Sequence, residues 1–248
     1  MTEVRRSSQN KLLKYYQCFL AVVAVFIFFT EADNFFFDSG MTPAPKNVVI
    51  IMCLASTPLF ISLKSKNFQY IPINVILWCC LYSGISAASF LHQVPTELVT
   101  QELETRILSV LFIFLMILIL SGEPIVCKCT RWALVIAVLL AIVNNFRELT
   151  DPLAFNGFNV TGRAAGLYVD PNKSGAGLIM GLIFTIGLFP KKIRMLYFII
   201  VSMGVFTTFS RGAILSLVVL LFLLFIKGFI TTSQLNGTLA LLIAFLDL

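Results

Sequence analysis

The chain has 248 residues, of which 58% are hydrophobic and only 12% are charged, with a mean hydropathy of +0.94. Soluble domains average roughly 25% charged residues, so the composition excludes an ordinary soluble domain and predicts an integral membrane protein. The formal charge of +6 does not indicate a nucleic-acid partner, because the 18 Lys and Arg residues are scattered through short loops and not gathered in one polar domain.

Apolar runs recur along the chain at about the ~20-residue length of a membrane span. The first run, 15–30, follows a basic segment at 1–14, and no A-x-A-like cleavage site separates it from the next polar stretch, so we expect an uncleaved span. Further runs lie near 47–63, 71–91, 106–121, 131–146, 174–190, 194–210 and 212–230. A ninth run begins around Gly237 and reaches only Leu248.

We therefore predict an all-α, polytopic membrane protein with about eight complete spans and a partial ninth, because only helices satisfy their backbone groups through so many separate crossings. The expected organisation is a cytoplasmic segment at 1–14 followed by one membrane domain at 15–248. Six cysteines predict neither a disulfide framework nor a metal site, since most lie in apolar runs and Cys127-Lys128-Cys129 lacks a second pair.

The basic residues set the expected orientation, because Lys and Arg favour cytoplasmic loops. A cytoplasmic N-terminus places most of them inside, including Lys64, Lys66, Lys128, Arg131, Lys191, Lys192, Arg194 and Lys227. The loop at 147–173 is then external, as is the turn Phe209-Ser210-Arg211-Gly212. Arg163 and Arg211 run against the bias, since both face outward.

A polar, glycine-rich stretch at 162–177 interrupts the apolar runs and is the expected working surface. Asp170-Pro171-Asn172 predicts a turn into a helix, with Asn172 or Ser174 as the N-cap. Gly177 and Gly181 form a GxxxG match, which predicts close helix approach.

Ser210 is predicted to cap a second helix on the same face of the membrane. Free N–H groups at helix N-termini, together with the guanidinium groups of Arg163 and Arg211, form a site for an anion such as phosphate. The alternative left open by these residues is an ordinary loop, with both arginines anchored at the lipid head groups.

Two short elements carry a resemblance to a known family. Arg163-Ala164-Ala165-Gly166-Leu167-Tyr168-Val169-Asp170-Pro171-Asn172 is close to an R-x-x-G-x-x-x-x-P-N element, and Thr208-Phe209-Ser210-Arg211-Gly212-Ala213 is close to a T-x-S-R-G-A element. In this order, within about residues 160–225, they resemble the O-antigen ligase and polymerase superfamily of bacterial envelope polysaccharide assembly. The first 150 residues contribute hydropathy only.

The resemblance implies a membrane glycosyltransferase of GT-C-like fold in the bacterial inner membrane. It implies a glycan donor linked to undecaprenyl pyrophosphate and, as acceptor, either a lipid-A core or a growing glycan, without a metal or other cofactor. By the same resemblance Arg163 and Arg211 hold the donor pyrophosphate, supported by Gly166, Asn172 and Ser210. Ligases and polymerases share both elements, so the two activities stay open.

The general base stays open as well. His92, the sole histidine, lies outside both elements. Glu148, Asp151 and Asp170 are expected to be solvated residues of the external loop, with the alternative that Asp170 sets the turn into the following helix. Family members continue into a larger external loop with a functional histidine, so we expect a fragment whose 248 residues alone are inactive. A transporter or flippase of envelope precursors, or a non-catalytic membrane remnant, is the alternative, although the expected spans keep their ionisable residues near their ends.

Overall fold

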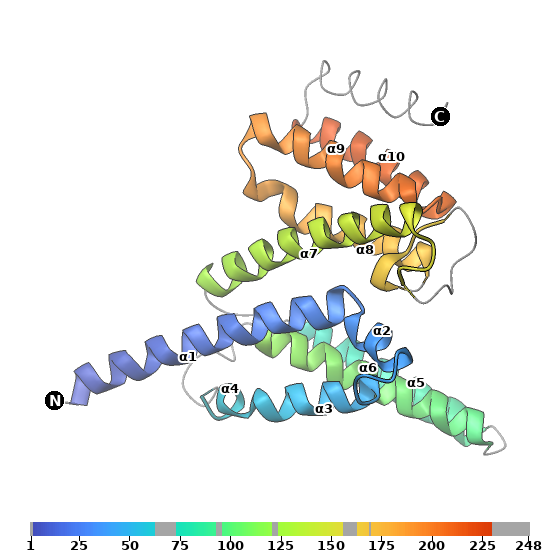
Figure 1. Cartoon of the computed structure of the whole chain (residues 1–248). Coiled ribbons are helices and arrows are strands. Elements are labelled where there is room, and N and C mark those ends of the chain that lie inside the picture. The colour runs from blue at the N-terminus through green and yellow to red at the C-terminus, as the bar shows by residue number, and fades with distance from the viewer. Residues whose placement is uncertain are drawn as a thin grey trace. The chain divides into compact units, whose positions relative to one another are not determined.

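The computed structural model describes residues 2–62, 73–92, 96–120, 124–155, 163–168 and 170–229 (Figure 1). These ranges contain helices and turns and no strand, which confirms the predicted all-α class for the described residues. The α-helices are α1 Thr2–Ala24, α2 Ala32–Asp38, α3 Pro45–Ala55, α4 Thr57–Ser62, α5 Ile73–Leu91, α6 Glu97–Leu120, α7 Pro124–Thr150, α8 Pro171–Thr185, α9 Lys191–Thr207 and α10 Arg211–Ile226. A π-helical turn, η1 Val25–Phe29, continues α1, and the 3-10 turns η3 Gly166–Tyr168 and η4 Ile186–Leu188 flank α8.

Four helical segments in the described residues are long and apolar enough to cross a membrane, namely Lys11–Phe29, Ile73–Leu91, Glu97–Leu120 and Pro124–Thr150. They correspond to four of the predicted spans. The helices at the other four predicted positions are shorter, and the ninth run, Gly237 to Leu248, lies outside the described residues.

Prolines lie near two interruptions of the apolar runs. The run at 47–63 is divided at Ser56 into α3 and α4, because Pro58 has no N–H to donate to a carbonyl of the preceding turn. The run at 174–190 ends as a helix at Thr185, passes through η4 and reaches Pro190, which precedes α9. Hydropathy alone does not detect either break.

Several helices extend beyond the predicted spans, and α1 begins at Thr2 instead of near 15. α6 begins at Glu97 instead of near 106, and α7 continues to Thr150 instead of ending near 146. The added turns contain charged residues, which lower the local hydropathy without preventing helix formation. Glu148 therefore lies in the last turn of α7 and not in the external loop where it was predicted.

The chain divides into two compact units, one formed by Met1–Ala24 and Thr42–Thr130 and the other by Val25–Met41 and Arg131–Leu248. In the first unit, α6 packs against α1, α3, α4 and α5. Two side chains of α1 bond backbone carbonyls at the ends of neighbouring helices. The Tyr16 hydroxyl donates to Ala55 O at 2.6 Å, and the Gln17 amide donates to Leu118 O and Ile119 O at 3.2 and 3.1 Å.

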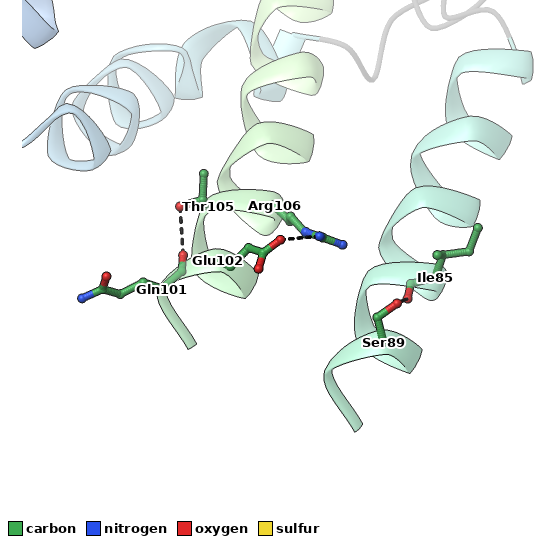
Figure 2. A network of polar contacts seen from close by, with 6 residues as sticks. All are labelled: Ile85, Ser89, Gln101, Glu102, Thr105 and Arg106. Carbon is green, nitrogen blue, oxygen red and sulfur yellow. Dashed lines mark hydrogen bonds and ion pairs between the residues drawn. The ribbon is translucent and has the colours of Figure 1, made fainter. Parts of the chain in front are cut away.

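The first turns of α6 carry the charged residues Glu102 and Arg106, which Figure 2 shows in contact. Glu102 and Arg106 form an ion pair one turn apart, and Arg106 points toward α5, where Ser89 lies. These three residues help to line a cavity of about 20 Å³, room for about one water molecule. The remainder of α6, residues 107–120, carries no charge.

The second unit has its core where α8 packs against α9 and α10 (Figure 1). The close approach of α8 to its neighbours depends on its glycines. A Cβ at Gly175 would lie 2.5 Å from the Ala213 Cβ of α10, and one at Gly181 would overlap Val138 of α7. A Cβ at Gly177 would lie 2.7 Å from the Tyr168 hydroxyl oxygen. The close packing predicted from the GxxxG match is confirmed.

Candidate functional site

The N-terminus of α8 is capped by Asp170. Its Oδ1 accepts from the Asn172 N–H at 2.8 Å, and its carbonyl accepts from the Ser174 N–H at 3.0 Å. The prediction of Asn172 or Ser174 as the cap is therefore wrong. Pro171 occupies the first helical position, where its missing N–H costs nothing, so the residue before it is the cap.

The N-terminus of α10 is capped by Ser210, as predicted. The Ser210 Oγ accepts from the Ala213 N–H at 3.3 Å. The connection from α9 is tight and includes Phe209 at φ +46°, a left-handed conformation that costs a non-glycine residue roughly 1–3 kcal/mol. Thr208 fixes this turn, since its hydroxyl donates to Val205 O at 2.7 Å and accepts from the Ser210 N–H at 3.3 Å.

The side chain of Asn172 joins the segment that begins at Arg163 to the N-terminus of α10. Its Oδ1 accepts one hydrogen bond from Arg163 Nη2 at 3.2 Å and another from Ser210 Oγ at 3.0 Å. Arg163 also donates from Nε to Thr208 O at 3.2 Å. Both donors hold the carbonyl oxygen of the Asn172 amide, and its NH₂ group has no hydrogen-bond partner among the described residues, so it can donate to a ligand.

Arg211 is the first residue of α10 and its side chain is exposed. Its guanidinium makes no hydrogen bond or ion pair with another described residue. Three features thus lie at one end of α8 and α10: a half-buried arginine, an amide NH₂ group and an exposed arginine. Two helix N-termini lie beside them, and that of α8 is capped by the Asp170 carboxylate. Such a set favours an anion.

A third cation at this end of α8, Lys173, is already paired. Its Nζ lies 3.2 Å from Glu31 Oε2. Burial raises the pKa of nearby Asp33, and the positive charge of Lys173 partly opposes that rise. The positive charge of Lys173 is thus shared with carboxylates, and among the described residues at this end of α8 and α10 Arg163 and Arg211 are the cations without a carboxylate partner.

The segment that carries Arg163 is held by a buried carboxylate. Glu148 is 3% exposed, and its Oε2 accepts from the N–H groups of Ala165 and Gly166 at 2.7 and 2.6 Å. Between them and Arg163, the Ala164 N–H donates to Thr207 O at 3.0 Å. The prediction that Glu148 is a solvated loop residue is therefore wrong.

The backbone conformation and the close packing at position 166 of this segment require glycine. The φ of Gly166 is +59°, and a Cβ would lie 2.9 Å from Asn145 Oδ1. Asn145 is fully buried and donates to the Ser174 hydroxyl at 3.0 Å, which joins α7 to α8. Helical spacing could have revealed Asn145 and Glu148, since they continue the buried face of α7 that includes Val138 and Ala141.

Beside this segment lies an apolar cavity of about 180 Å³. Its wall includes Phe26, Leu140, Leu167 and Tyr168. The Tyr168 hydroxyl donates to Phe29 O at 2.6 Å, and burial, together with nearby Glu31, raises the pKa of this phenol above its ordinary value. The tyrosine therefore remains neutral and contributes its ring to an apolar surface.

The other candidate bases differ in their surroundings, and of these only Asp170 contacts a residue of this arrangement in the described part of the chain. His92 is exposed directly after α5 and belongs to the first unit. Asp151 is exposed at the end of α7, and Asp170 is used as a helix cap. Comparisons with models of protein families, with curated proteins and with solved structures find no match for this chain, so an assignment of function rests on the geometry of these residues.

Proposed function

We propose that the chain is a membrane glycosyltransferase of the O-antigen ligase or polymerase type. In this proposal the N-terminal ends of α8 and α10 bind the pyrophosphate of an undecaprenyl-linked glycan donor. The main support is the shared contact of Arg163 and Ser210 with Asn172 Oδ1, which joins the two sequence elements across 38 residues of chain.

The chemistry of the site suits this reaction. The bond between the donor sugar C1 and the pyrophosphate oxygen breaks, the acceptor oxygen bonds to C1, and the acceptor proton leaves to a base or to water. Negative charge develops on the pyrophosphate as it departs. Fixed donors such as the Arg163 guanidinium and the Asn172 NH₂ stabilise that charge where it forms.

We propose that the first isoprenoid carbons of the donor lie in the same unit. The apolar cavity of about 180 Å³ shares Leu167 and Tyr168 with the segment that begins at Arg163. A polar end for the pyrophosphate and an adjacent apolar wall for isoprenoid carbon are the two surfaces that a lipid-linked donor requires.

We further propose that the helices are inserted in the inner membrane with the N-terminus in the cytoplasm and the anion site outside. α7 has 27 residues, which at 1.5 Å per residue gives about 40 Å, longer than a hydrocarbon core of roughly 30 Å. Its basic end at Lys128 is placed inside and its Glu148 end outside, as the positive-inside rule favours.

Cysteine labelling at the two ends of α7 tests this orientation. In a protein whose six native cysteines have been replaced, Asp151→Cys should react with an impermeant maleimide in spheroplasts. Lys128→Cys should react only after permeabilisation. Both positions are exposed, so accessibility within the protein does not limit labelling. Reaction of position 128 alone before permeabilisation would show the opposite orientation.

Deletion of the gene tests the activity. The expected result is loss of long surface glycan on a silver-stained gel, with recovery when the gene is returned on a plasmid. Absence of all lipid-A-linked repeats would identify a ligase, and retention of single repeats would identify a polymerase. An unchanged glycan pattern in the deletion strain would contradict both activities.

A further inference from the structure

We infer that Glu148 is a positioning residue for the anion site: its buried carboxylate fixes the backbone at 164–166, and this backbone fixes the Arg163 guanidinium. The inference rests on the proposed function only for the identity of what Arg163 binds. The contacts themselves are those of Glu148 Oε2 with the N–H groups of Ala165 and Gly166, at 2.7 and 2.6 Å.

Packing alone does not explain a carboxylate at this position. Glu148 is 3% exposed, and its second oxygen, Oε1, is buried without a hydrogen-bond partner in the described part of the chain. It also lies in the last turn of α7, where the helix dipole disfavours negative charge. An apolar side chain would be buried there at lower cost, so what the carboxylate contributes is its strong hydrogen bonds to two buried N–H groups.

These bonds act at a short distance along the chain from Arg163. Ala165 and Gly166 are held by Glu148, and Ala164 is held from the other side by Thr207 O at 3.0 Å. Three consecutive N–H groups are thus fixed directly after Arg163. Its side chain extends from this anchored backbone to Thr208 O and Asn172 Oδ1.

The same geometry argues against Glu148 as the general base. A base must reach the acceptor hydroxyl directly or through one water, whereas this side chain is almost fully buried and its Oε2 is already occupied by two donors. Positioning requires an acceptor oxygen and does not require a charge. Glutamine keeps that oxygen, and alanine removes it.

Trypsin provides a readout that is independent of any ligand. The bond after Arg163 is a potential tryptic site that the hydrogen bonds of Ala164 and Ala165 protect, and both alanines are fully buried. In purified full chain in nanodiscs, Glu148→Ala and Glu148→Asp should each raise cleavage after Arg163 at least tenfold. Glu148→Gln should remain within about threefold of wild type. Asp151→Ala, which removes an exposed carboxylate near the end of α7, is the matched control.

Binding of inorganic pyrophosphate to the same samples completes the test. We expect at least tenfold weaker binding for Glu148→Ala and near-normal binding for Glu148→Gln. If Glu148→Ala does not fold, Gly166→Ala replaces it in the test, because this variant alters the backbone residue that Glu148 holds. Gly166→Ala should then show increased cleavage after Arg163 and weaker pyrophosphate binding. The inference would be overturned if Glu148→Asp and Gly166→Ala resisted trypsin as well as wild type does. It would also be overturned if Glu148→Gln resisted trypsin but bound pyrophosphate weakly. If wild type binds no pyrophosphate, the proposed function fails, and the cleavage pattern alone still decides whether Glu148 holds this segment.

Discussion

Replacing Arg163 by lysine is expected to reduce glycan transfer by roughly 100-fold or more, although the positive charge is retained. The loss of one preorganised donor commonly costs about 10²–10³ in rate. Arg163 uses Nε for Thr208 O and Nη2 for Asn172 Oδ1, and its other N–H groups remain for the pyrophosphate. Lysine has a single ammonium group and does not reproduce this two-pronged anchoring.

The measurement is the amount of glycan transferred by cells that carry Arg163→Lys in the chromosomal gene, at matched protein level. Arg211→Lys is expected to reduce transfer as well, because a guanidinium presents paired donors to a phosphate and an ammonium does not. Arg147→Lys is the control, since Arg147 is exposed and its guanidinium lies 5.9 Å from the Phe155 ring. Normal transfer by both Arg163→Lys and Arg211→Lys would assign these arginines to head-group anchoring.

Asn172→Asp is expected to weaken pyrophosphate binding at least about tenfold while leaving the local structure intact. An aspartate can still accept from Arg163 and Ser210, as Asn172 Oδ1 does, and a negative charge in the first turn of α8 suits the helix dipole. It lacks the NH₂ group, however, and places a like charge beside the ligand. Such a charge at about 4 Å costs about 4 kcal/mol near a protein surface, so binding should weaken at least about tenfold.

Two measurements separate this effect from misfolding. Thermal unfolding of Asn172→Asp in detergent should occur at or above the wild-type temperature, while titration with inorganic pyrophosphate shows the loss of affinity. Asn47→Asp provides a matched control, because Asn47 is an exposed asparagine in the first turn of another helix that begins with proline, α3. Unchanged pyrophosphate affinity in Asn172→Asp would show that the amide NH₂ does not face the anion.

Much of the local structure followed from sequence. Long apolar runs predicted helices, because backbone groups in an apolar medium must bond within their own segment. Ser210 was predicted as a cap from its place before a helix, and the structure confirms it. The Asp170 cap could also have been assigned, since proline at the first helical position makes the preceding residue the cap. Hydropathy gave less accurate helix ends, because charged first and last turns resemble loops in composition.

The sequence by itself determined the helical class, the apolar segments and the two polar elements, since each depends on neighbours along the chain. The tertiary structure alone decided that Asn172 receives both Arg163 and Ser210, and that Ala165 and Gly166 supply the N–H groups that bond Glu148. Composition assigned Glu148 to solvent, because a carboxylate is usually exposed. Whether it is buried depends on N–H groups supplied by another segment, and the spacing of residues along one helix does not reveal which segment will supply them.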